Sequence, residues 1–217
     1  KLDTFKSLIV PVLYVGFPIL LVFMQPDLGT SLVYMAIFIG MLFISGIRLR
    51  LIRIIATVGV LLMPLAWFIL KDYQKKRILV FMNPDIDPFG SGYHIIQSKI
   101  AIGSGTIFGK GLFNGTQSQL NFLPENHTDF IFSVIGEELG FIGCIIVLIL
   151  LFMLIYRSIK VAYTCNDRFG MLLATGIGSM LCFEVLVNAG MTMGIMPVTG
   201  IPLPFISYGV SALTTNM

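Results

Sequence analysis

Apolar residues in this chain form long, nearly unbroken runs and are not spaced along one face of a helix or a strand. Short polar stretches separate most of the runs. A helix that crosses the hydrocarbon core of a bilayer needs about 20 predominantly apolar residues. The pattern therefore predicts an all-α, polytopic transmembrane helix bundle with five full helices and one truncated helix. The predicted runs cover about residues 7–24, 31–47, 51–70, 130–156, 170–196 and 209–217.

One long stretch of mixed composition, residues 71–129, lies between the third and fourth runs. Apolar residues at positions 95, 96, 100 and 102 within it fit a short amphipathic helix in the membrane interface. Five glycines follow: Gly103, Gly105, Gly109, Gly111 and Gly115. They are either turn residues or a set of backbone N–H donors that approach a phosphate. Their spacing alone does not choose between the two interpretations.

Basic residues mark one side of the predicted membrane domain. They occupy one set of run ends: Lys1, Lys6, Arg48, Arg50, Arg53, Arg157, Lys160 and Arg168. The short loops at the opposite ends, residues 25–30 and 197–208, contain neither Lys nor Arg. Because short cytoplasmic loops are enriched in Lys and Arg, we expect the first set to face the cytoplasm. The stretch 71–129 contains basic residues too, but long loops count little in this rule, so we expect it to be extracytoplasmic.

Composition excludes several other classes of protein. Hydrophobic residues make up 56% of the 217 residues and charged residues only 12%, whereas soluble domains have about 25% charged residues. The three cysteines show no CxxC spacing and there are two histidines, so we expect free thiols and no Cys/His metal site. Lys and Arg flank apolar runs, a pattern that does not indicate nucleic-acid binding. Because the chain opens with Lys1 and stops within the sixth run, we expect it to be part of a longer one, with residues 1–217 forming a single membrane domain.

Acidic residues inside or beside the runs are candidates for function, because charge in a membrane is costly. Asp129 lies directly before the fourth run. It is either the N-cap of that helix, a role that Thr128 could also fill, or a functional carboxylate at the outer mouth, near Glu125 and His127. A helix N-terminus lowers a carboxyl pKa and burial raises it. The sequence therefore leaves open whether Asp129 is a general base or a cation ligand.

The remaining acidic residues have structural alternatives. Glu137 lies two helical turns after Asp129 on the same face, and Glu138 points about 100° away. We favour a neutral or paired glutamate that fixes helix packing for Glu137, and the same for Glu184 in the fifth run. Asp27 lies in a Pro-Asp-x-Gly turn, where it is either a favoured turn residue or a functional carboxylate. The predicted structural polar residues are Asp27, Glu137, Glu138, Glu184 and Asn188.

Residues 197–209 contain three prolines and two glycines. Proline removes a backbone donor and clashes within a helix, so this segment is not a regular helix. Irregular backbone at membrane depth must be buried in protein or line a polar cavity. The segment is therefore predicted to form a cavity wall or a re-entrant hairpin.

Five segments in this order resemble the SEDS family, the shape, elongation, division and sporulation proteins. They are residues 25–31, 92–105, 123–132, 136–140 and 197–209, which together run over nearly the whole chain. A further segment, residues 111–120, resembles the elongation branch of the family, the RodA-like proteins. One departure occurs after the proline-rich segment: the family usually reads Ser-Tyr-Gly-Gly-Ser-Ser, but this chain has Val210 at the second glycine.

The resemblance implies a peptidoglycan glycosyltransferase of the bacterial cytoplasmic membrane, with its active site on the extracytoplasmic face. Such enzymes polymerise lipid II during elongation and shape maintenance, together with a class B penicillin-binding protein and the elongation machinery. Asp129 matches the essential aspartate of the family, which deprotonates the acceptor sugar hydroxyl or binds a divalent cation, Mg²⁺ or Mn²⁺. Undecaprenyl diphosphate is the leaving group.

The expected substrate contacts lie in the same segments. Lys99 and Lys110 would neutralise the diphosphate as point charges, or would instead extend to lipid headgroups. The predicted substrate-binding residues are Gln97, Lys99, Lys110, Glu125, His127, Thr128, Pro202 and Ser207.

Two other functions remain as alternatives. A flippase for lipid-linked cell-wall precursors would need polar residues along a path through the bundle, and Glu137, Glu184 and Asn188 allow that reading. A non-catalytic scaffold of the cell-wall machinery is favoured only by Val210.

Overall fold

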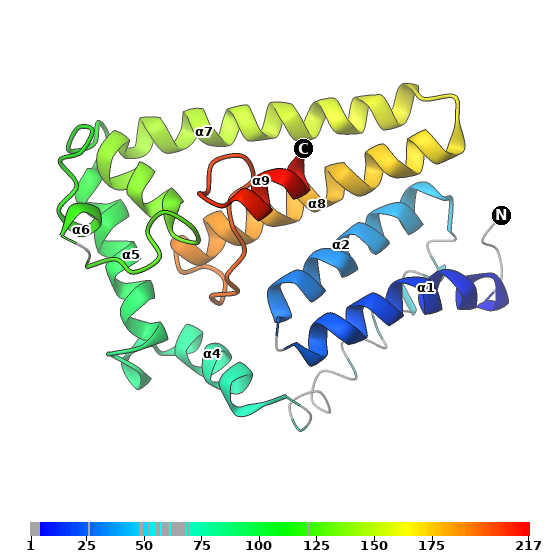
Figure 1. The fold of residues 1–217 in the computed structure, drawn as a ribbon, viewed down its shortest axis with the longest axis horizontal. Coiled ribbons are helices and arrows are strands. Elements are labelled where there is room, and N and C mark those ends of the chain that lie inside the picture. The colour runs from blue at the N-terminus through cyan, green and yellow to red at the C-terminus, as the bar shows by residue number, and fades with distance from the viewer. Residues whose placement is uncertain are drawn as a thin grey trace. The chain divides into compact units, whose positions relative to one another are not determined.

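Every regular element that the structure describes is helical, and the described residues contain no β-strand. The structure is a computed structural model that describes residues 5–25, 27–47, 50, 51, 53, 54, 57, 61, 68, 70–120 and 122–217. Its elements are α1 (Phe5–Met24), α2 (Leu28–Ile44), α4 (Asp72–Met82), η1 (Pro84–Ile86), α5 (Ser91–Gly105), α6 (Thr116–Gln119), α7 (Ile131–Thr164), α8 (Arg168–Thr192) and α9 (Val210–Asn216) (Figure 1). The predicted all-α class is confirmed.

The predicted transmembrane runs correspond to helices wherever the structure describes them. Helices α7 and α8 are long and apolar enough to cross a bilayer, and α1 and α2 are shorter apolar helices. The sixth run begins as α9. Most of the third run, 51–70, lies outside the described residues.

Two helix ends differ from the prediction for local reasons. Helix α7 continues past the predicted end at Tyr156 to Thr164, because the helical hydrogen-bond ladder does not stop where the apolar run does. Helix α8 ends at Thr192 rather than at Met196. Gly194 adopts a positive φ of 70° there, and the N–H of Ile195 donates to the carbonyl of Gly190 at 2.8 Å. A left-handed glycine after the last turn is a common helix stop.

Packing divides the chain into two compact units, the first of which comprises Lys1–Lys75 and Ile155–Met180. In this unit α1 and α2 lie side by side (Figure 1). Glycines allow α2 to approach the first half of α8: a Cβ added at Gly40 would overlap the Ser179 side chain, and one added at Gly176 would overlap Met41. Small residues at helix contacts are typical of bundles that assemble in lipid.

The second unit, Lys76–Leu154 and Leu181–Met217, contains most of the stretch 71–129. That stretch forms α4, η1, α5 and α6, and the predicted amphipathic helix corresponds to α5. Buried serines join α5 to its neighbours within the unit. The hydroxyl of Ser98 lies 2.6 Å from that of Ser133 on α7 and 2.6 Å from the carbonyl of Thr192 on α8.

Helix α7 is interrupted at Gly140, where φ is 68° and ψ is −164°. The carbonyls of Glu137 and Glu138 would otherwise accept hydrogen bonds from the N–H groups four residues later. They accept instead from the N–H groups of Lys110 and Gly111, each at 3.0 Å. The displaced N–H groups of Phe141 and Ile142 donate to the carbonyls of Thr106 and Ile107, at 2.9 and 3.2 Å. Residues 106–111 are therefore inserted into the hydrogen-bond ladder of α7.

The insertion requires a glycine in the inserted segment, Gly109, and a glycine in the helix, Gly140. A Cβ on Gly109 (φ 80°) would overlap the carbonyl oxygen of Glu138 and lie 2.7 Å from the amide nitrogen of Gly140. The N–H groups of Gly109 and Gly111 donate to the carbonyls of Gly105 and Glu138. Because these two donors are used inside the protein, the turn interpretation holds for both glycines and the phosphate interpretation does not.

Substitution of Gly140 by alanine is expected to destabilise the protein by more than about 1 kcal/mol, because a side chain at positive φ is strained. The added Cβ would also lie 2.7 Å from the carbonyl oxygen of Ile107. The midpoint of thermal unfolding in detergent measures the effect. Gly103→Ala is the matched control: nothing lies within 4 Å of a Cβ there, and alanine favours helix. Equal midpoints for the two variants would contradict this account of the break.

Candidate functional site

Asp129 lies in a tight turn that leads into α7. The N–H groups of Thr128 and Phe130 both donate to the carbonyl of Glu125 at 3.2 Å. Glu125 has a positive φ of 52°, a conformation that costs a non-glycine residue energy and is often found at functional sites. The turn therefore places the Glu125 and Asp129 carboxylates on the same short loop.

The predicted N-cap role does not describe this turn. Helix α7 begins at Ile131, and no hydrogen bond among the described residues uses the carboxylate of Asp129. The Thr128 hydroxyl points back toward Glu125 and donates to its Oε2 at 3.1 Å. Asp129 thus keeps a half-buried carboxylate with no capping function.

The proline-rich segment packs against this turn through backbone contacts. The N–H of Tyr208 donates to the carbonyl of His127 at 2.8 Å. The Ser207 hydroxyl donates to the carbonyl of Thr128 at 2.7 Å and accepts from the N–H of Leu203 at 2.7 Å. The segment is not helical between Met193 and Gly209, as predicted, and it closes one side of the Asp129 turn.

Asn188 on α8 joins the same two segments. Its side-chain amide donates to the carbonyl of Asp129 at 2.9 Å and to that of Ile201 at 2.7 Å. A Cβ added at Gly200 would lie 3.3 Å from Oδ2 of Asp129, so the backbone at Gly200 borders the carboxylate directly. Asn188 is fully buried, which makes it a structural support of the turn, in line with its predicted class.

Opposing effects act on the Asp129 carboxyl. Burial raises its pKa above the usual aspartate value, and the nearby charge of Glu125 raises the pKa further. The Arg77 guanidinium acts in the other direction and lowers the pKa, but the net shift is upward. The sequence left open whether the helix N-terminus lowers the pKa of Asp129 or burial raises it. In the structure the effect of burial is the larger one.

Arg77 was not among the predicted site residues. It lies on α4, and its Nη1 donates to the carbonyl of Thr199 at 3.4 Å. This contact joins residues that are 122 positions apart. In the sequence Arg77 appears only as one of several basic residues in a long loop, and the fold alone brings it to Asp129.

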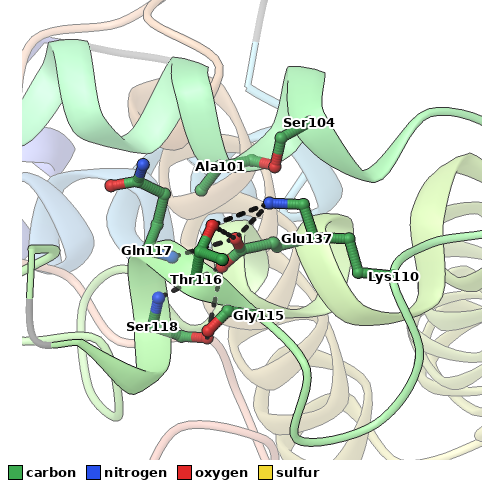
Figure 2. A network of polar contacts seen from close by, with 8 residues as sticks. All are labelled: Ala101, Ser104, Lys110, Gly115, Thr116, Gln117, Ser118 and Glu137. Carbon is green, nitrogen blue, oxygen red and sulfur yellow. Dashed lines mark hydrogen bonds and ion pairs between the residues drawn. The ribbon is translucent and has the colours of Figure 1, made fainter.

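Glu137 is fully buried and accepts a set of hydrogen bonds from one loop (Figure 2). Its Oε1 accepts from Lys110 Nζ at 2.9 Å, from the Thr116 hydroxyl at 3.2 Å and from the N–H of Gln117 at 2.9 Å. Its Oε2 accepts from the N–H and the hydroxyl of Ser118 at 3.1 and 3.2 Å. The favoured interpretation, a paired glutamate that fixes packing, agrees with this network.

Lys110 is the cationic partner in that network. Its ammonium is hydrogen-bonded to Glu137 and to Thr116, so its charge is already compensated inside the protein. The predicted diphosphate contact of Lys110 remains a prediction, but the pairing does not favour it.

The other predicted substrate contacts fall into two groups. Glu125, His127, Thr128 and Ser207 are joined around Asp129 by the contacts given above, and Pro202 is half-buried in the proline-rich segment. Gln97 and Lys99 lie on α5, half-buried and exposed respectively. The Lys99 side chain passes over Gly194, where an added Cβ would overlap it. No contact among the described residues joins Gln97 or Lys99 to Asp129.

Similar proteins identify the family. Residues 2–217 match the family that comprises FtsW, RodA and SpoVE, described as cell cycle proteins. The chain belongs to this family. It is the SEDS family that the sequence motifs predicted.

Two relatives of this chain have the name peptidoglycan glycosyltransferase, one of them as a probable one. The chain is 50% identical over 201 residues to the peptidoglycan glycosyltransferase MrdB of Escherichia coli K12, covering 92% of this chain and 54% of that protein. It is 42% identical over 214 residues to the probable peptidoglycan glycosyltransferase FtsW of Aliivibrio salmonicida, covering 97% of this chain and 53% of the relative. The chain therefore spans about half the length of these curated relatives.

A solved structure supports the SEDS fold. It belongs to a study of the structural coordination of polymerization and crosslinking by a peptidoglycan synthase complex. The TM-score is 0.76 at 31% identity, and the match covers 98% of this chain and 59% of that chain.

The structure shows how exposed the remaining predicted polar residues are and which contacts they make. Asp27 caps α2, accepting from the N–H and the hydroxyl of Thr30 at 3.0 and 2.7 Å. It is exposed, and its contacts agree with the predicted structural role, because capping needs only the free N–H groups of the first turn. Glu138 and Glu184 are buried, and Oε2 of Glu184 has no hydrogen-bond partner among the described residues. Val210 is exposed at the start of α9.

A divalent cation would find two carboxylates in this turn, those of Glu125 and Asp129. Burial is the main cause of the raised pKa of Asp129, and the repulsion between the two carboxylates is the second; a cation would relieve that repulsion. No group of three or more His, Cys, Asp or Glu side chains suited to a metal occurs in the described part of the chain. Mg²⁺ commonly takes one or two carboxylates together with substrate phosphates and water, so the pair fits such an ion only with ligands from elsewhere.

Replacing Asn188 with leucine, which has a similar shape, is expected to lower the free energy of unfolding by about 1–3 kcal/mol. The carbonyls of Asp129 and Ile201 would lose their shared donor, and unpaired buried polar groups cost about that much. Thermal unfolding in detergent measures the change. Asn166→Leu, at an exposed position, is the matched control; a loss as large in the control would argue against the bridging role.

Proposed function

We propose that the protein to which this chain belongs is a peptidoglycan glycosyltransferase that polymerises lipid II into glycan strands during cell elongation. The observation that carries the proposal is the half-buried Asp129 carboxylate, which caps no helix and has a raised pKa. The names of the relatives MrdB and FtsW support the reaction class. Residues 111–120, which resemble the elongation branch of the family, support the elongation role.

Asp129 is proposed to act as the general base. A base works best when its pKa lies close to the pH at which it operates, and burial moves the pKa of Asp129 in that direction. The carboxylate accepts the proton of an acceptor sugar hydroxyl as that oxygen attacks the anomeric carbon of the donor. A new glycosidic C–O bond forms, the bond from the anomeric carbon to the diphosphate oxygen breaks, and the diphosphate leaves with the electron pair.

Arg77 is proposed to stabilise the charge that develops on the leaving diphosphate. A guanidinium has five N–H donors, and Arg77 uses only Nη1 in its contact with Thr199 among the described residues. Arginine pairs well with phosphate oxygens, and placing a cation where charge develops lowers the barrier. A bound Mg²⁺ or Mn²⁺ at Glu125 and Asp129 would supply the same electrostatic stabilisation.

The membrane setting supports the same reaction. Asp129 lies two residues before the first residue of α7, a helix long enough to cross the bilayer, and the distribution of Lys and Arg favours the extracytoplasmic side for this end. A lipid-linked donor keeps its diphosphate at the membrane surface, which is the depth of such a turn. We propose the bacterial cytoplasmic membrane as the location and a class B penicillin-binding protein as the partner, as the related peptidoglycan synthase complex suggests.

Flipping of a lipid-linked precursor is the second candidate. The buried Glu184, whose Oε2 has no partner among the described residues, is the observation that favours it. Glu137, which also belonged to the suggested transport path, is instead occupied by the loop network. Asn188, the third residue of that path, is engaged with the carbonyls of Asp129 and Ile201. With two of its three polar residues engaged in this way, the path is less well supported than the glycosyltransferase site.

Asp129→Asn in the full-length protein is expected to lower lipid II polymerisation by a factor of about 10² to 10⁴, the usual contribution of a general base. The assay follows labelled glycan strands made with the penicillin-binding partner, whose transpeptidase is blocked. Thermal unfolding and partner binding serve as controls and should be unchanged. A fully active Asp129→Asn protein would remove Asp129 from the chemistry.

Two charge variants are expected to move the acid limb of the pH–rate profile in opposite directions. Activity falls as the pH drops through the pKa of Asp129, because the protonated carboxyl cannot accept a proton. Glu125→Gln removes the repulsion that raises this pKa, so the limb should move to lower pH. Arg77→Met removes the attraction that lowers it, so the limb should move to higher pH. Shifts of the same sign in both variants would contradict the assignment.

A further inference from the structure

The side chain of Glu137 accepts more hydrogen bonds than a role in helix packing alone requires. Its buried carboxylate accepts from five donors, and all of them belong to residues 110–118 (Figure 2). Two of these donors are backbone N–H groups, those of Gln117 and Ser118. Each of the two carboxylate oxygens of Glu137 accepts from one of these backbone N–H groups. The network therefore requires an acceptor at both oxygens, which a carboxylate provides, and the ion pair with Lys110 is only one part of it.

The backbone of Glu137 holds the beginning of the same loop. Its carbonyl accepts from the N–H of Lys110 at 3.0 Å, within the break in α7. The side chain holds the end of the loop at Ser118. One residue of α7 thus fixes both ends of the segment 110–118.

The loop in turn holds the Asp129 turn. Ser118 is 6% exposed, and its carbonyl accepts from the side-chain amide of Asn126 at 3.0 Å. Asn126 is 7% exposed and directly follows Glu125. A second bond runs in parallel, from the N–H of Leu123 to the carbonyl of Gln117 at 3.2 Å. A continuous path of hydrogen bonds therefore leads from Glu137 through Ser118 to Asn126.

The two sides of the turn have different supports. The side that contains His127, Thr128 and Asp129 is held by Asn188 and by the proline-rich segment. On the side that contains Glu125 and Asn126, the path from Glu137 is the support from outside the turn, and Glu125 is otherwise bonded only within the turn, to Thr128 and Phe130, among the described residues. Loss of that path would free Asn126 and let the Glu125 side of the turn shift away from Asp129, while the carbonyl of Asp129 stays fixed on Asn188.

We propose, on the basis of the function proposed above, that Glu137 is a positioning residue: through Ser118 and Asn126 it holds the turn that carries Glu125 and Asp129 in its working geometry. Glu137 does not touch substrate in this account. Its effect on the reaction is indirect and passes through the loop.

The experiment compares wild type with Glu137→Gln and Asn126→Leu in the full-length protein. Glu137→Gln keeps the size of the side chain but replaces one acceptor oxygen by an NH₂ group. Asn126→Leu removes the last bond of the path and leaves every bond to Glu137 in place. Glu138→Gln is the matched control, because it makes the same change one residue later, at a side chain for which no hydrogen bond is described.

Two measurements are made on each variant. The first is the pH–rate profile of lipid II polymerisation with the partner's transpeptidase blocked. The second is hydrogen exchange of the peptide that covers residues 123–130, which needs no activity. A misplaced catalytic group costs up to about 100-fold in rate, so kcat should fall by up to that factor in both variants.

The results expected for a positioning residue differ from those expected for a purely structural one. In Glu137→Gln and in Asn126→Leu the acid limb moves to lower pH, because Asp129 becomes less buried and is farther from Glu125, and residues 123–130 exchange faster. The double variant loses no more activity than the worse single variant, since both residues lie on one path. Glu138→Gln keeps the wild-type profile and the wild-type exchange.

Other results would overturn the proposal. A purely structural role lowers activity in proportion to the folded fraction and leaves the shape of the profile and the exchange of residues 123–130 unchanged. If Glu137→Gln does not fold, Asn126→Leu decides alone: an unmoved profile and unchanged exchange reject the path. If wild type makes no glycan strands, the glycosyltransferase function fails, and the exchange measurement still decides whether Glu137 orders the turn.

Discussion

Backbone hydrogen bonding at the break in α7 is the constraint on which the arrangement of this site depends. A helix in lipid cannot leave its carbonyls and N–H groups unpaired, and the break at Gly140 releases two of each. Residues 106–111 pair with all four, so this loop is joined to α7 by backbone and not by side chains alone. The loop then continues to the Glu137 carboxylate and to the turn of Asp129. Through these contacts the position of α7 fixes the position of the Asp129 turn.

This support allows the Asp129 carboxylate to remain without hydrogen-bond partners among the described residues. A half-buried carboxylate is costly unless it is paired, and the surroundings restrain it without neutralising it. Asn188 holds its backbone carbonyl, Gly200 borders its oxygen, and the charges of Glu125 and Arg77 oppose each other. Such a group is suited to accept a proton from a substrate, because the pairing that would make it inert is missing.

The sequence was a good guide where a short stretch of chain determines the outcome. Run length predicted the apolar helices, proline and glycine content predicted the irregular segment at 197–209, and the position of Glu137 suggested a packing role. The motifs also predicted the family. The pattern failed where distant residues decide: Arg77 meets Thr199 across 122 positions and Lys110 meets Glu137 across 27. The N-cap interpretation of Asp129 was wrong because the turn closes on Glu125 before the helix begins.

The central claim is that Asp129 is a base whose pKa is raised by its surroundings. Infrared difference spectroscopy of the full-length protein, with Asp129→Asn used to assign the band, measures the protonation midpoint of this carboxyl directly. The account predicts a midpoint above that of an ordinary aspartate, coincident with the acid limb of polymerisation. A midpoint at or below the ordinary value, with the acid limb elsewhere, would contradict it.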